Sequence, residues 1–151
     1  MNRVVAYCSL LVVGAFFSVT TVCNPALLSD DNGFLKELVG VNLLLVSGVI
    51  LTITLASAGQ IHLSLNEIEA KYDGPFLHKT RSGVHSSAYW LIALFLAGAA
   101  DVILKHYFGG LSWESFFNSV ALFILFWMVL IMASLTRLIF AIKPHHQPPT
   151  R

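Results

Sequence analysis

The chain has 151 residues, of which 56% are hydrophobic and only 11% are charged, and its mean hydropathy is +0.75. A typical soluble domain has about 25% charged residues. This composition excludes a water-soluble protein of the same length, because lipid is the solvent that accepts so much apolar surface. The net charge is +1 and there is no basic tract, so we expect no nucleic-acid partner.

Four segments are apolar enough to cross a bilayer, and each is close to the roughly 20 residues that a spanning helix needs. Backbone polar groups in lipid must be satisfied within their own segment, so each segment is predicted to be helical. The predicted spans are residues 4–23, 38–60, 87–104 and 115–136. The predicted fold class is an all-α membrane protein with four transmembrane helices in one domain, residues 1–142, followed by a disordered tail at 143–151.

The first span could instead be a cleaved signal peptide, because Asn2 and Arg3 precede it. The apolar stretch is longer than the about 7–15 residues of a signal-peptide core. Thr20, Thr21 and Val22 would also make a poor cleavage site. We therefore expect a helix that is retained.

Lysine and arginine residues are distributed unequally between the two sides of the predicted membrane. If the N-terminus is cytoplasmic, two of the nine, Lys36 and Lys105, lie outside. The other seven lie inside: Arg3, Lys71, Lys79, Arg81, Arg137, Lys143 and Arg151. Because basic residues in short loops favour the cytoplasmic side, both termini and the central connection are predicted to be cytoplasmic.

The second helix is predicted to extend into the cytoplasm, as the first part of a hairpin over residues 61–86. Its apolar residues fall at helical spacing on one stripe, Ile61, Leu65, Ile68 and Tyr72. Asp73, Gly74 and Pro75 would then end the helix. The stripe could pack on the bilayer surface or on a neighbouring subunit, or it could dock a soluble cytoplasmic partner. The first interpretation of the basic residues Lys79 and Arg81 is that they determine the orientation in the membrane. The second is that they form a patch that binds lipid phosphate or a partner.

Asp101 is the only charged residue within a predicted span, and charges inside membranes are costly and often functional. Lys105 follows one helical turn later, so one interpretation is an Asp101–Lys105 pair near the outer interface. The other is a cation or proton site that lines a pore. Asn42 and Asn118 are predicted to lie at the same level as Asp101 and to form a polar cluster with it.

Catalytic and metal-binding patterns do not occur in the sequence. The six histidines lack metal-site spacing with cysteine or aspartate. Phosphate loops and nucleophile motifs are missing as well. We therefore expect no enzyme activity and no cofactor.

Three features describe the layout of the chain: the polar outer loop Asp30-Asp31-Asn32-Gly33, the helical extension from Leu65 to Tyr72 and the basic run to Arg81. In these features the chain resembles small four-helix membrane proteins of bacterial phage-defence systems, such as the membrane component of lambda Rex exclusion. Small membrane accessories of CRISPR loci share this layout. The resemblance implies a protein of the bacterial inner membrane that changes membrane permeability or relays a signal from a soluble partner.

Two functions are consistent with these features. The first is an oligomeric membrane effector that alters permeability in phage defence and is gated or recruited through the cytoplasmic hairpin. The alternative is a non-conducting binding protein, such as an immunity protein against a pore-forming toxin or a membrane anchor for a soluble protein.

Overall fold

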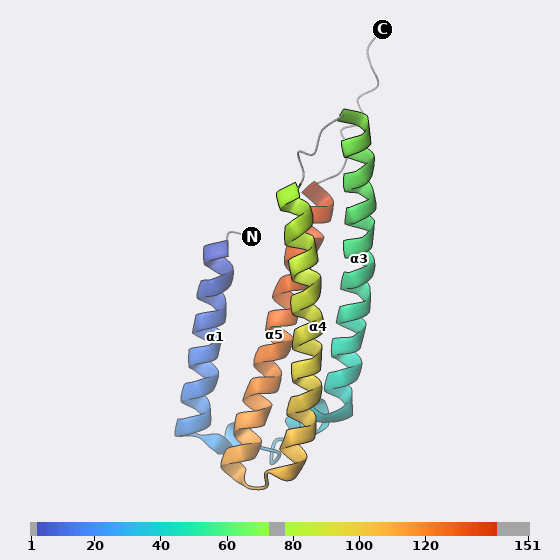
Figure 1. The fold of residues 1–151 in the computed structure, drawn as a ribbon. Coiled ribbons are helices and arrows are strands. Elements are labelled where there is room, and N and C mark those ends of the chain that lie inside the picture. Colours follow the sequence, from blue (N-terminus) through green and yellow to red (C-terminus); the bar gives the residue numbers. More distant parts are fainter. Residues whose placement is uncertain (1–2, 73–77, 142–151) are drawn as a thin grey trace.

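The computed structural model describes residues 3–72 and 78–141 and consists of four long helices joined by short connections (Figure 1). The long helices are α1 (Arg3–Cys23), α3 (Leu43–Tyr72), α4 (His78–Tyr107) and α5 (Leu111–Ala141). The short elements between α1 and α3 are η1 (Pro25–Leu27), α2 (Gly33–Glu37) and η2 (Leu38–Asn42). The predicted tail at 143–151 and the predicted stop at Asp73–Pro75 lie outside the described residues.

Among the described residues, four helical segments are long and apolar enough to cross a membrane: Val4–Cys23, Gly33–Glu67, Thr80–Tyr107 and Leu111–Phe140. This confirms the all-α class and the number of apolar helices, and it is consistent with a multi-pass integral membrane protein. The first segment coincides with its predicted span, but the other three are longer than predicted. Hydropathy marks the apolar part of a helix, whereas helical hydrogen bonding continues into the polar turns beyond it.

The second apolar segment is broken near its start, where the backbone of Val39 and Gly40 leaves the helical conformation. Such a break frees backbone carbonyls from helical hydrogen bonds, and these carbonyls then accept from water or from side chains. The Asn42 side chain is one such donor, because its Nδ2 lies 3.1 Å from the Glu37 carbonyl oxygen. The break therefore separates the short helix α2 from the straight helix α3.

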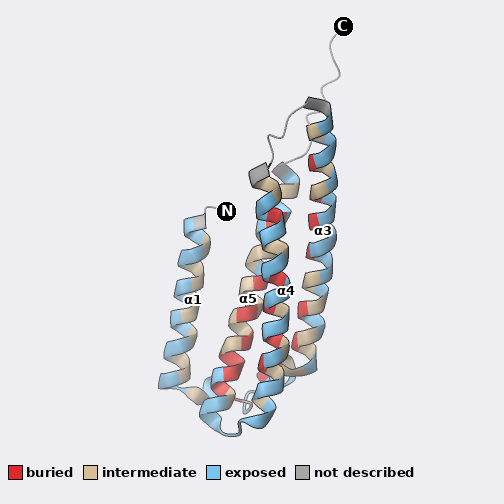
Figure 2. Cartoon of the chain, viewed as in Figure 1, coloured by how far each residue is buried: buried red, intermediate tan, exposed pale blue. Residues whose placement is uncertain are grey.

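Three of the long helices, α3, α4 and α5, pack against one another, and α1 packs on α5 (Figure 2). Within Val4–Cys23 no residue is buried. The three packed helices share buried residues along their whole length, from Leu43 and Ala121 at one end, through Leu91 and Met128, to Ile61 and Leu135 at the other. We call the end with residues 24–42 and 108–110 the turn end, and the opposite end, with the N-terminus, the terminal end.

Helix α3 continues to Tyr72, as the sequence predicted, but its apolar stripe is not a free docking surface. Ile61 and Leu65 are 2% and 1% exposed and pack in one cluster with Val84 of α4 and Leu135 of α5. The prediction of a docking stripe is wrong for these two residues. The spacing defines an apolar face correctly, but α4 and α5 reach the same height and cover it. The side chains of Ile68 and Tyr72 lie outside the described residues.

Residues 78–86 were expected to lie in a hairpin connection, but they form the first turns of α4. Within these turns Arg81 pairs with Glu69 of α3, with 2.9 Å between Nη2 and Oε2, and also donates to Asn66. Ser82 and Gly83 therefore do not interrupt the helix, because packing and this ion pair hold it against α3. The side chain of Lys79 lies outside the described residues.

Candidate functional site

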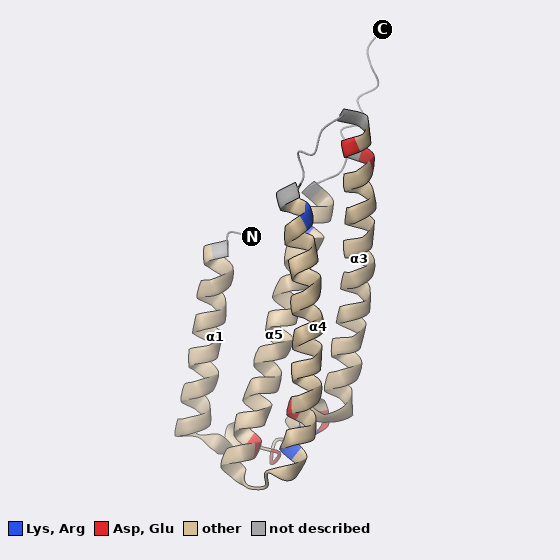
Figure 3. Ribbon diagram, viewed as in Figure 1, with Lys and Arg blue, Asp and Glu red and all other residues tan. Residues whose placement is uncertain are grey.

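Charged residues in the described part of the chain gather near the two ends of the helices and leave the middle apolar (Figure 3). At the turn end, Lys105 of α4 is the centre of a polar cluster. Its Nζ donates to Asp30 Oδ1 at 2.7 Å and to Asn118 Oδ1 at 2.7 Å, and it lies 3.4 Å from the Val39 carbonyl oxygen. One ammonium group thus connects α4 to the loop before α2, to α5 and to the break before α3.

Asn118 of α5 is fully buried and holds the loop from the other side. Its Nδ2 donates to the Leu28 carbonyl oxygen at 2.7 Å and to Asp30 Oδ1 at 3.0 Å. The backbone N–H of Asp30 in turn donates to Glu114 Oε2 at 3.4 Å. These bonds satisfy the polar groups of the loop against the first turns of α5, so the loop is part of the packed structure.

The charge of Asp30 is stabilised within this cluster. Burial raises the pKa of its carboxyl, but hydrogen bonds from Lys105 and Asn118 and the charges of Lys105 and Lys36 outweigh burial, so that the pKa lies below 3.8, its ordinary value. A carboxyl with a lowered pKa in the folded state stabilises the fold above its ordinary pKa. That stabilisation is lost as the pH falls through the lowered value.

Asp101 does not form the expected pair with Lys105. Asp101 is 5% exposed, and its Oδ2 is buried without a hydrogen-bond partner among the described residues. Lys105 binds Asp30 instead, because the loop before α2 folds over the end of α4. The three residues Asp101, Asn42 and Asn118 therefore do not form the predicted cluster. Asn118 belongs to the Lys105 cluster, and Asn42 donates to the Glu37 carbonyl at the helix break. Asp101 contacts neither asparagine through a hydrogen bond among the described residues.

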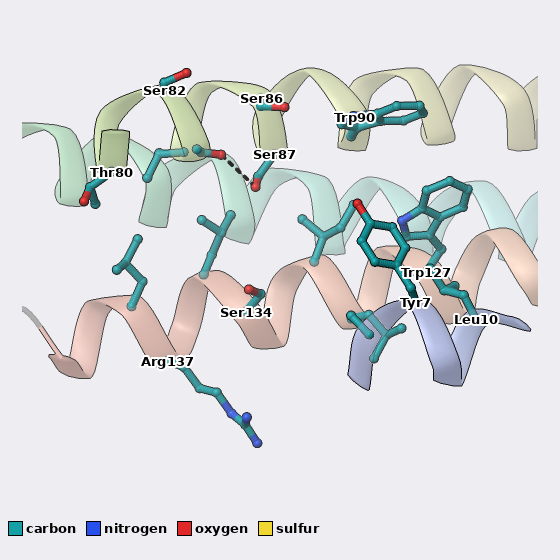
Figure 4. A pocket seen from close by; sticks show the side chains of 17 residues that line it. Tyr7, Leu10, Thr80, Ser82, Ser86, Ser87, Trp90, Trp127, Ser134 and Arg137 are labelled. Atoms are coloured by element: carbon teal, nitrogen blue, oxygen red, sulfur yellow. Dashed lines mark hydrogen bonds between the residues drawn. The ribbon is translucent and has the colours of Figure 1, made fainter. Parts of the chain in front are cut away.

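The second candidate site is a groove at the terminal end, between α1, α4 and α5 (Figure 4). Its volume is about 1090 Å³. Helix α1 contributes Ala6, Tyr7 and Leu10 to the lining, and α4 contributes a row of small residues that includes Gly83 and Ser87. The Ser87 hydroxyl donates to the Gly83 carbonyl oxygen at 2.9 Å. These small residues leave the space that larger side chains would fill.

The two ends of the groove differ in chemistry. Trp90 of α4 and Trp127 of α5 stack at one end, with ring centroids 5.5 Å apart and an interplanar angle of 25°. At the other end lie Thr80 and Arg137 (Figure 4). Arg137 is exposed, and among residues 3–72 and 78–141 no carboxylate forms an ion pair with it. The groove therefore has an aromatic end and a cationic end. We call the end with Trp90 and Trp127 the floor and the end with Thr80 and Arg137 the mouth.

Helix α1 closes onto α5 beyond the groove, towards the turn end. The hydroxyls of Thr21 and Ser119 are 2.6 Å apart, and a Cβ added at Gly14 would lie 3.4 Å from the Phe123 ring. A hydroxyl pair and a residue without a side chain allow two helices to approach closely in a membrane. The groove is thus open only over the terminal half of α1.

Comparisons with known proteins gave no relative of this chain, because no protein-family model, no curated protein and no solved structure matches it. What the protein does is therefore inferred from the cluster and the groove. Sequence reasoning named Lys105 and Asn118 but did not predict that they meet at Asp30, and it missed the groove. The signals available were the lone Lys105 at an otherwise apolar helix end and the Ser82, Ser86 and Ser87 row on α4.

Proposed function

We propose that the chain is a multi-pass membrane protein that binds the apolar part of an amphiphilic molecule in the groove between α1, α4 and α5. The observation that carries this proposal is a groove of about 1090 Å³ with a stacked tryptophan pair at one end and Arg137 at the other. Ligand pockets of this kind combine apolar and aromatic walls with a few polar groups that orient the ligand. In the bilayer the groove opens towards lipid.

The buried position of Asp101 favours a binding protein over a permeability effector. A ring of carboxylates around an oligomer axis would require Asp101 on the outer surface of each protomer. Its side chain is instead 5% exposed within one chain. We therefore favour the non-conducting alternative over the permeability effector, but the ligand proposed here is an amphiphile instead of a toxin or a soluble protein. A role in phage defence stays a prediction from the resemblance in layout. Homo-oligomers and a soluble partner stay predictions as well.

We also propose that the terminal end is cytoplasmic, because five of the seven lysine and arginine residues in the described part of the chain lie on that side, and two, Lys36 and Lys105, lie at the turn end. Reporter fusions after Lys79 and after Lys143 should be active in the cytoplasm. A fusion after Asp31, in the loop at the turn end, should be active outside. A cytoplasmic signal from the Asp31 fusion would contradict this orientation.

Filling the groove tests the binding function. A Cβ at Gly83, which lines the groove, meets no atom within 4 Å. The Gly83→Phe variant should therefore fold normally, and its phenylalanine side chain should occupy the mouth of the groove. Purified wild-type protein should retain a bound amphiphile in native mass spectrometry, and the variant should lose most of it.

Gly59 of α3 provides a matched control. It is also helical, exposed and free of atoms within 4 Å of a built Cβ, but it lies outside the groove. Gly59→Phe makes the same change in side chain and in helix propensity, and it should leave the bound amphiphile in place. Equal retention by both variants, or no bound amphiphile in the wild type, would contradict the proposed function.

A further inference from the structure

The length of the groove indicates which kind of amphiphile fits. Its lining on α5 begins at Trp127 and reaches Arg137 and Leu138. Trp127 and Arg137 are ten residues apart, which is about 15 Å along a helix axis. This is about half of a hydrocarbon core that is roughly 30 Å thick. The groove therefore has the depth of one leaflet.

A transmembrane helix of a partner would need an open surface over both leaflets. Here the second leaflet is closed, because α1 lies against α5 at Gly14–Phe123 and at Thr21–Ser119. A molecule with its apolar part in one leaflet and its polar group at the interface matches the open half. Membrane phospholipids have this shape.

The residues at the mouth of the groove indicate the charge of the ligand's polar group. Arg137 lies near the end of α5 and forms no ion pair with the described carboxylates. Figure 4 shows its side chain extending from α5 away from α4, at the same end of the groove as Thr80. A guanidinium group binds phosphate through charge-assisted, often bidentate hydrogen bonds, and the Thr80 hydroxyl adds a neutral donor at this end of the groove.

We infer that the groove binds an anionic phospholipid of the cytoplasmic leaflet, with its phosphate at Arg137 and an acyl chain over the Trp90–Trp127 pair. This inference rests on the proposed function and names the ligand class. An acyl chain fits the apolar floor, because Leu10 and Leu130 line the groove together with the two tryptophans. The anionic headgroup supplies the partner that the Arg137 charge lacks among the described residues.

Quenching of tryptophan fluorescence by brominated acyl chains tests the inference in the full-length protein. Trp113 lies at the turn end, in contact with Phe108 and Phe117, so a Trp113→Phe background restricts the signal to the groove pair. In nanodiscs of zwitterionic lipid, brominated phosphatidylglycerol should quench at lower mole fractions than brominated phosphatidylcholine. One cationic residue near the surface is worth about 1 kcal/mol, so the preference should be about fivefold.

Arg137→Gln should remove most of this preference, because quenching by phosphatidylglycerol should fall more than quenching by phosphatidylcholine, whose headgroup has no net charge. Lys36→Gln removes the same charge at the turn end and should keep the preference. Equal quenching by both lipids in the wild type, or an unchanged preference in Arg137→Gln, would overturn the anionic headgroup and leave the proposed function intact. Quenching by neither lipid above that of free tryptophan in the same nanodiscs would overturn the proposed function as well.

Discussion

Replacing Lys105 with methionine should lower the free energy of unfolding by about 2–3 kcal/mol, since the change leaves partly buried polar groups without their charged partner. Asp30 would lose its ion pair, and the Asn118 and Val39 oxygens would lose their donor. Methionine keeps the length and helix propensity of the side chain, so that packing of α4 is preserved. The variant should insert normally but unfold earlier in a denaturant titration in detergent micelles.

The ion pair at the terminal end provides the control. Arg81 and Glu69 lie 2.9 Å apart, and Lys105 and Asp30 lie 2.7 Å apart. The two carboxylates are similarly exposed, at 21% for Glu69 and 26% for Asp30, but the cations differ, at 32% for Arg81 and 11% for Lys105. Arg81→Met should therefore cost less than about 1 kcal/mol, as more exposed pairs do. A loss of stability that is equal in the two variants would contradict a special role for Lys105.

The pH dependence identifies the partner of Lys105. The pKa of Asp30 is lowered in the folded protein by the hydrogen bonds and charges of the cluster, which outweigh the effect of burial. Wild-type stability should fall as the pH drops below 3.8, the ordinary value, because the unfolded state then binds the proton more readily. Lys105→Met should show a smaller loss over this range.

Replacing Asp101 with leucine should raise the free energy of unfolding, by about 1–2 kcal/mol. The carboxyl is 5% exposed, and its Oδ2 has no partner among the described residues. Burying a polar group without a hydrogen bond is unfavourable, and leucine has a similar branched shape without that cost. Unfolding of the variant in the same micelles measures the change.

Asp101→Asn is the matched comparison for the leucine variant. The amide keeps the shape and the buried polar atoms, so its stability should lie closer to the wild type. A loss of more than about 1 kcal/mol in the leucine variant would show that the carboxyl has a partner, since lost hydrogen bonds to charged groups cost this much or more. A gain would identify Asp101 as a residue that lowers stability and is therefore a candidate for function.

Much of the fold could be predicted from hydropathy, because an apolar segment of sufficient length has few alternatives to a helix in lipid. The span at 4–23 coincides with the observed segment Val4–Cys23. The continuation of α3 to Tyr72 was also predicted. The ends of the helices were less predictable, since turns at 78–86 depend on packing and on the Arg81–Glu69 pair.

The candidate sites were less predictable than the helices because they depend on contacts between distant parts of the chain. Spacing of one turn suggested an Asp101–Lys105 pair, but Lys105 binds Asp30, 75 positions away. Likewise the apolar face at Ile61 and Leu65 was recognisable, but the helices that cover it were not. The groove arises from small residues on separate helices, and no local pattern in the sequence indicates that such positions meet.

Helix α1 is in close contact with α5 at one end only, so a small rotation about that contact would move the other end of α1 like the arm of a lever. Its pivot is the close contact from Gly14 to Thr21, and the free arm runs from Gly14 back to Arg3, roughly 16 Å of helix. A rotation of about 10° at the pivot would move the end of this arm by roughly 3 Å. Transmembrane helices tilt to match the thickness of the bilayer. We therefore expect a change in bilayer thickness to change the width of the groove along Ala6, Tyr7 and Leu10.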